Sequence, residues 1–178
     1  IHGDVTRGFT VRATGNIQVD GVIESCMVEA GENLIVSSGV QGQDCAMIRA
    51  HKSIYAKYLE RCRVYALESV QADCIIDCTI YSNGTVKART GRGVIIGGII
   101  RSAHEVSATI VGSKVERLTS IFLGGLPCEE SERTEILSDL DRISNEISIL
   151  EEQPDSPSKQ AFQASSQFLS QSDEASET

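Results

Sequence analysis

Large aromatic side chains are scarce in this sequence. The 178 residues include no tryptophan and only 4% aromatic residues, whereas the hydrophobic content is 40%, mainly Val, Ile, Ala and Leu. A globular core built around large rings is therefore not expected. No apolar run approaches the roughly 20 residues that a membrane-spanning helix needs, so we expect no direct membrane insertion.

The cysteine patterns of secreted and metal-binding proteins are also missing. The six cysteines, at positions 26, 45, 62, 74, 78 and 128, include no Cys-x-x-Cys pair, and no secretory signal is recognisable. We therefore expect a cytoplasmic location with free thiols, because the cytosol is reducing. The chain begins at Ile1, which fits a fragment of a longer chain.

Excess positive charge is absent. The formal net charge is −9; residues 129–178 contain 13 acidic and 3 basic residues, and residues 1–128 contain 12 and 13. The acidity therefore belongs to the C-terminal part, while the rest is close to neutral. This distribution favours neither nucleic-acid binding nor a polybasic membrane surface.

A short apolar pattern recurs along the first two thirds of the chain. Residues 26–36 (CMVEAGENLIV), 62–72 (CRVYALESVQA) and 78–88 (CTIYSNGTVKA) share it. A [Val/Ile]-x-[Ala/Ser] step recurs in it, at Val11/Ala13, Val28/Ala30, Ile48/Ala50, Val64/Ala66, Ile80/Ser82 and Ile100/Ser102. An apolar residue stands four positions after each small one: Ile17, Leu34, Ile54, Val70, Val86 and Val106. The resulting intervals of 16–20 residues are typical of a solenoid.

The repeat length selects the kind of solenoid. It is too short for the two helices of a helical repeat, and the leucine-rich pattern is missing. A third apolar point in each repeat, at Val22, Val40, Leu59, Ile75 and Ile95, indicates three short strands per coil. The sequence thus predicts an all-β fold, a parallel β-helix of about six coils over residues 1–125. The irregular period favours the right-handed form.

One predicted inward column consists mostly of small side chains. It contains Phe9, Cys26, Ala46, Cys62, Cys78 and Gly98. Buried cysteine packs as a small hydrophobe, so we interpret the column as inert core. A single column does not supply the convergent ligands of a metal site. Cys62 and Cys78 lie on neighbouring coils, but parallel, in-register side chains seldom adopt disulfide torsions, so we predict free thiols.

The outward column beside it reads Arg12, Glu29, Arg49, Tyr65, Tyr81 and Arg101. Tyr and Arg are favoured at protein interfaces, so the predicted interaction face is Arg49, Tyr65, Tyr81 and Arg101. Stacked aromatic residues also stabilise a sheet without any partner, and that alternative remains open.

Two coils are longer than the rest. Their extra residues lie within 37–47 (SSGVQGQDCAM) and 89–98 (RTGRGVIIGG), which we expect in the same sector of the solenoid, three coils and so roughly 14 Å apart along one side. Both loops are rich in glycine, but neither opens a helix or contains Gly-Lys-[Ser/Thr], so phosphate binding is not expected.

The residues needed for catalysis do not gather. His2, His51 and His104 fall in different coils, and the aspartates are scattered over turns without a paired acid. We therefore predict no enzyme activity, no cofactor, no metal site and no small-molecule substrate.

The C-terminal part has a different pattern. Residues 126–152 are predicted to form an amphipathic, coiled-coil-type helix, with Pro127 near its start and acidic residues in its first turns. Its apolar residues follow a heptad spacing: Ile136, Leu140, Ile143, Ile147 and Leu150. So short a seam must pack on the solenoid, on a second helix or on another chain, and we expect protein partners and a homo-oligomer. Residues 153–178 are predicted to be a disordered, polar acidic tail.

Several longer motifs resemble one family. GDV (3–5), AGENLIVSSGVQG (30–42), IYAKYLERCRVYA (54–66) and GRGVIIGGIIRSAHEVSATIVGS (91–113) are similar to the β-solenoid domain of the flagellar assembly protein A (FapA) family. The resemblance covers about residues 1–125. It implies a right-handed parallel β-helix followed by a coiled-coil region, in a cytosolic bacterial protein with a structural or regulatory role and no catalytic residues.

A second resemblance leads to an alternative function. AGENLIVSSGVQG followed by AMIRAHKSIYAKYL (46–59) is similar to the C-terminal β-helix of the cell-division regulator MinC, which dimerises and binds a membrane-associated ATPase. The chain has more coils than that domain and an additional helix. Bactofilin-like polymerising scaffolds are related in architecture only. We therefore expect a scaffold of the flagellar assembly protein A type.

Overall fold

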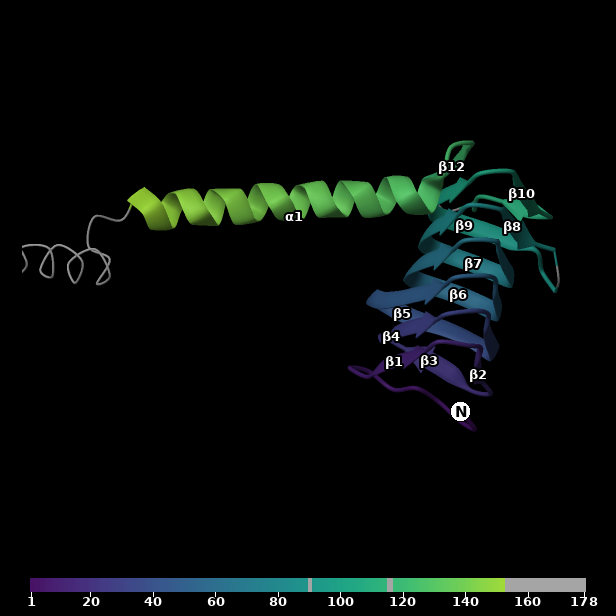
Figure 1. Ribbon diagram of the computed structural model, residues 1–178. Coiled ribbons are helices and arrows are strands. Elements are labelled where there is room, and N and C mark those ends of the chain that lie inside the picture. The colour runs from purple at the N-terminus through teal and green to yellow at the C-terminus, as the bar shows by residue number, and fades with distance from the viewer. Residues whose placement is uncertain (90, 115–116, 153–178) are drawn as a thin grey trace, which may run out of the picture. The chain divides into compact units, whose positions relative to one another are not determined.

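The computed structural model describes residues 1–89, 91–114 and 117–152, and they form a stack of parallel strands followed by one helix (Figure 1). The predicted tail, 153–178, lies outside the described residues. The strands are β1 (Thr10–Ala13), β2 (Ile17–Val19), β3 (Val22–Glu24), β4 (Met27–Ala30), β5 (Leu34–Ala50), β6 (Ile54–Ala66), β7 (Ser69–Ser82), β8 (Thr85–Ala88), β9 (Val94–Ser102), β10 (Glu105–Ala108), β11 (Ile110–Val111) and β12 (Thr119–Leu123). The helix α1 spans Pro127–Glu152.

All strand pairs are parallel, and together they form a β-solenoid of about seven turns. The long strands β5, β6 and β7 bend around corners and contribute to three faces. The first face consists of β1, β4, residues 46–50, 62–66, 78–82 and 98–102, and β12. The second face consists of β2, residues 34–36, 54–56 and 69–72, β8 and β10. The third consists of β3, residues 39–41, 58–60, 74–76 and 94–96, and β11.

The predicted inward columns are confirmed over the middle coils. Fully buried positions with 0% exposure include Val28, Ile48, Val64, Ile80 and Ile100 on the first face. Their small neighbours at 30, 50, 66, 82 and 102 are also buried, as are the second-face residues at 34, 54, 70 and 86. Branched side chains suit this role because they fit a pleated, half-buried surface and lose little χ1 freedom there.

The inward positions differ from the prediction at two places. Ile23, not Val22, faces the core on the third face, because Ile23 pairs with Val40 and Val22 with Gly39. Phe9 is 64% exposed, because β1 is the edge strand of its face among the described residues. The solenoid has about seven turns where about six were predicted: β12 continues the first face beyond residues 98–102, and Val5 pairs with Ile23 at the N-terminal end.

The extra residues of the two long coils do not occupy one sector, contrary to the prediction. In the first long coil the register shifts by one residue between Val36 and Gly39 and by three between Gln41 and Ala46. In the second, all four extra residues lie between Ala88 and Val94. Most of the first insertion is therefore at the corner between the third and first faces, and the second is at the corner between the second and third faces.

The chain divides into two compact units that do not coincide with the end of the solenoid. The first comprises Ile1–Arg133 and so includes the first seven residues of α1, and the second begins at Thr134. Among the described residues, α1 is too polar to be a membrane-spanning helix.

Candidate functional site

Seven outward side chains on the first face form one continuous column, which we call the outer ladder. Its rungs, in register from coil to coil, are Arg12, Glu29, Arg49, Tyr65, Tyr81, Arg101 and Phe122. The first six rungs match the predicted column. Phe122 is an additional rung that the sequence pattern missed, because Ile121-Phe122-Leu123 lacks the small residue of the repeat.

Neighbouring rungs interact directly. The rings of Tyr65 and Tyr81 are stacked, with centroids 5.0 Å apart and an interplanar angle of 8°. The guanidinium carbon of Arg49 lies 5.1 Å from the Tyr65 centroid, and that of Arg101 lies 4.7 Å from the ring of Phe122. Such cation–π contacts and aromatic pairs each contribute about 0.5–1.5 kcal/mol. The outer ladder therefore stabilises the first face without any partner.

The start of α1 packs on the same face. The backbone N–H of Cys128 donates a hydrogen bond to Asn83 Oδ1 at 3.0 Å, and its thiol donates to the carbonyls of Ala66 and Tyr81 at 3.4 Å. Burial raises the pKa of the Cys128 thiol, which is thus held as a neutral donor. Glu132 forms an ion pair with Arg49, Oε1 to Nη1, at 2.7 Å. These contacts satisfy one of the unpaired N–H groups at the helix N-terminus.

The contacts at the helix start bear on the predicted interaction face. Tyr65 is only 3% exposed, so its ring is part of the packing around the helix start and is not a free surface. Tyr81 and Arg101 are half-buried, and the Arg49 side chain is 28% exposed and already paired. The structure brings the four residues together in one column, and their role in binding a partner stays a prediction.

Shallow hollows lie on the first face beside the outer ladder. One is lined by Arg12, Met27, Glu29, Met47 and Arg49. A second adjoins the helix start, where Cys128, Glu129 and Glu132 face His51 and Leu67. Among the described residues no group of three His, Cys, Asp or Glu side chains could hold a metal ion.

The histidines remain apart. His2 hydrogen-bonds Asp20, Nδ1 to Oδ2, at 2.7 Å near the N-terminus, and His51 and His104 are exposed at corners of different coils. Nothing in this arrangement pairs a nucleophile with a general base.

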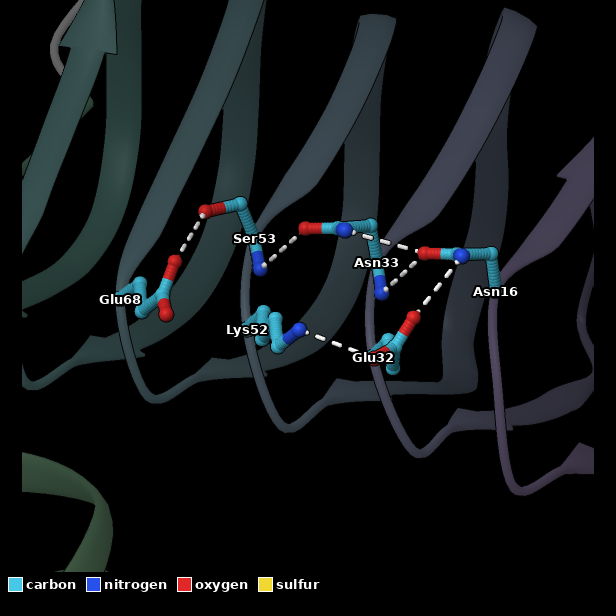
Figure 2. Close-up of polar contacts among 6 residues, drawn as sticks. All are labelled: Asn16, Glu32, Asn33, Lys52, Ser53 and Glu68. Atoms are coloured by element: carbon cyan, nitrogen blue, oxygen red, sulfur yellow. Dashed lines mark hydrogen bonds and ion pairs between the residues drawn. The ribbon is translucent and has the colours of Figure 1, made fainter.

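A second polar arrangement, the corner ladder, connects the first and second faces (Figure 2). It contains Asn16, Glu32, Asn33, Lys52, Ser53 and Glu68. Asn16 Oδ1 accepts hydrogen bonds from the backbone N–H and the side-chain amide of Asn33, both at 3.0 Å. Asn33 Oδ1 in turn accepts the backbone N–H of Ser53 at 3.2 Å. The Ser53 hydroxyl donates to Glu68 Oε2 at 3.3 Å.

Charged groups complete the corner ladder. Lys52 Nζ donates to Glu32 Oε1 at 2.9 Å, and Asn16 Nδ2 donates to Glu32 Oε2 at 2.9 Å. The hydrogen bond and the charge of Lys52 lower the pKa of Glu32, and the same contact raises the pKa of Lys52. Both groups are therefore charged at neutral pH. Each link joins adjacent coils, so the ladder satisfies backbone groups at a turn that cannot pair as a strand.

We expect Asn33→Ala to weaken the solenoid by about 1–3 kcal/mol, because it leaves the N–H of the buried Ser53 without its acceptor. Asn16→Ala is the matched control, since Asn16 is exposed and water can replace its amide. Urea denaturation followed by circular dichroism measures both. Equal losses for the two variants would contradict this role of Asn33.

The two cysteines predicted to be neighbours approach each other inside the core. Cys62 Sγ and Cys78 Sγ are 3.5 Å apart and both residues are buried, whereas a disulfide needs about 2.05 Å. The Cys78 thiol donates to the carbonyl of Ile76 at 3.2 Å. The hydrogen bond to Cys78, together with burial, raises the pKa of Cys62. The two thiols therefore make a packing contact between adjacent coils.

The predicted seam of α1 is exposed. Ile136, Leu140, Ile143, Ile147 and Leu150 have exposed fractions between 47% and 65%. All five belong to the second compact unit, whereas the helix start belongs to the first. An amphipathic helix of this kind is stabilised mainly by packing of its apolar side.

Comparison with known proteins connects this architecture to a family. The model of the flagellar assembly protein A β-solenoid domain matches residues 1–178, the whole chain. The chain belongs to this family. Searches of curated proteins and of solved structures gave no match. The flagellar assembly protein A match confirms the resemblance seen in the repeat motifs, and it does not favour the alternative of a MinC-type division regulator.

Proposed function

We propose that this flagellar assembly protein A-type chain is a non-enzymatic scaffold that self-associates through the seam of α1. The family supports a scaffold of this type, and its members are of a non-catalytic kind. A cytoplasmic location is part of the proposal. The observation that carries self-association is the exposure of all five seam residues, from Ile136 to Leu150.

A second copy is the partner that the seam fits. Two heptads of apolar residues are too short to keep an isolated helix folded in water, but they can pair knobs-into-holes with an identical helix. The helix is also fixed at one end, because Cys128 and Glu132 contact the first face. The solenoid then serves as a rigid platform on each copy.

Sedimentation of the full chain over about 1–100 µM tests this proposal. We expect a monomer–dimer equilibrium that Leu140→Glu weakens at least tenfold, because a charge at the seam must be desolvated. Asn145→Glu adds the same charge to the same helix away from the seam and should leave the equilibrium within about twofold. A monomer at every concentration, or equal effects of the two variants, would rule out the seam as the contact.

A further inference from the structure

The heptad spacing of α1 places negative charge directly beside its apolar seam. The five seam residues occupy the a and d positions, with Leu140 and Ile147 at a. The e and g positions border the seam on its two sides, and from residue 137 to 151 they are Leu137, Asp139, Ser144, Glu146 and Glu151. Three of these border residues are acidic and none is basic. We call Asp139, Glu146 and Glu151 the acidic border.

The excess of negative charge extends over the whole helix. Residues 127–152 contain nine acidic and two basic residues, and residues 134–152, which carry the seam, contain six acidic residues and only Arg142 as a base. Arg142 forms an ion pair with Asp139, Nη2 to Oδ1, at 3.2 Å. Their side chains are 68% and 63% exposed, so water and salt screen this pair. The seam-bearing residues keep a balance of −5 with the pair included.

A second copy brings the same charge to the seam. In a parallel pair of helices, each g residue faces the following e residue of the partner, so that positions 146 and 151 of the two copies, both glutamates, lie opposite each other. In an antiparallel pair, g residues face g residues, and both g positions of the seam, 139 and 146, are acidic. Like charges that face each other oppose pairing. In either orientation, the acidic border therefore weakens the contact that the apolar seam favours.

A helix with lysine or arginine at its own border positions turns this repulsion into attraction. The long aliphatic stems of these residues also cover apolar surface at the edge of the seam while their charged ends stay in water. The seam from Ile136 to Leu150 is about 21 Å long at the helical rise of 1.5 Å per residue, so the fitting partner helix has about four turns. Complementary charge selects such a helix over a second copy.

We propose that the seam of α1 binds an amphipathic helix of a different protein, whose apolar stripe has a matching length and is bordered by lysine or arginine. This inference rests on the proposed function, because it takes the seam as a surface that pairs with helices. The second copy is then the weaker occupant of the seam, and the basic helix displaces it.

Peptide binding to the full chain tests the selection by charge. Two labelled peptides have the sequence of residues 127–152, one unchanged and one with Asp139→Lys, Glu146→Lys and Glu151→Lys. Their apolar seams are identical, so the comparison isolates the border. At about 50 mM salt, fluorescence anisotropy should show the lysine peptide binding about tenfold tighter, and at about 500 mM salt the ratio should fall below about threefold, because salt screens exposed charges. Equal affinities at low salt would overturn the proposal.

Variants of the full chain separate pairing at the seam from general attraction to an acidic protein. Leu140→Glu adds a negative charge but disrupts the seam, so it should weaken binding of the lysine peptide by about tenfold or more. Glu146→Lys should lower the preference for the lysine peptide roughly threefold or more, whereas Asp141→Lys, the same change away from the seam, should alter it by less than about twofold. Binding that survives Leu140→Glu, or equal effects of the two lysine variants, would contradict the proposal.

The same two peptides distinguish this inference from the proposed function. Binding of the unchanged peptide with an affinity equal to that of the lysine peptide would show that the seam pairs with a second copy and does not select by charge. Absence of binding by both peptides would show that the seam is not a pairing surface, and both proposals would then be wrong.

Discussion

Val64→Asp should unfold the middle of the solenoid. Val64 lies on β6 with 0% exposure, between Ile48 and Ile80 of the neighbouring coils. A carboxylate there has no hydrogen-bond partner, and its neutral form still leaves a polar group in an apolar column. We expect a loss of about 4 kcal/mol or more and a melting temperature lower by more than about 10 °C.

The control for Val64→Asp adds the same charge at an exposed site. Ser37→Asp, at a corner of β5, should change stability by no more than about 0.5 kcal/mol. Thermal and urea denaturation followed by far-ultraviolet circular dichroism measure both variants. Because each coil contacts only its neighbours, the break at Val64 should also broaden the transition. An unchanged melting temperature for Val64→Asp would mean that the assignment of inward residues is wrong.

Gly98→Ala should cause the second large loss, although alanine and cysteine occupy the same column in other coils. Gly98 has a backbone φ of +82°, a left-handed conformation that residues with a side chain rarely adopt. An added Cβ would lie 2.7 Å from the backbone nitrogen of Cys78 and closer still to its carbonyl oxygen. The left-handed backbone and the forced shift of the neighbouring coil together cost about 2–4 kcal/mol.

Gly15→Ala is the matched control for Gly98→Ala. A Cβ at Gly15 meets no atom within 4 Å, and its φ lies outside the left-handed range. That variant should be neutral or slightly more stable, because alanine reduces the entropy of the unfolded chain. Urea midpoints of the two variants compare them directly. A Gly98→Ala midpoint equal to that of Gly15→Ala would show that the coil accepts a side chain at residue 98.

The inward columns were predictable because they depend on local order. Side chains alternate along a strand, so a branched residue at Val64 and a small one at Ala66 share one side whatever the rest of the chain does. The same locality explains the error at Val22. Val22 and Ile23 are both apolar and either could face inward, and the pairing of Ile23 with Val5 and Val40 decides between them.

The corners and the candidate site were less predictable. Residues inserted at a corner leave the alternation of inward and outward side chains in the next strand unchanged. The apolar pattern of the sequence therefore does not show at which corner the inserted residues lie. Tyr65 lines one hollow together with Cys128 and Glu132, which come about 60 residues later in the chain. No local pattern connects them.

By itself, the sequence determined that this chain winds into a parallel solenoid of the flagellar assembly protein A family and ends in a helix with an apolar seam. Small and branched side chains at short, regular intervals suffice for that, because each coil need only match the next. Tertiary structure alone decided that the start of the helix lies beside Tyr65, and that Arg101 meets Phe122 on the outer ladder. These features join residues from different coils, and their positions depend on the register between strands rather than on order within one strand.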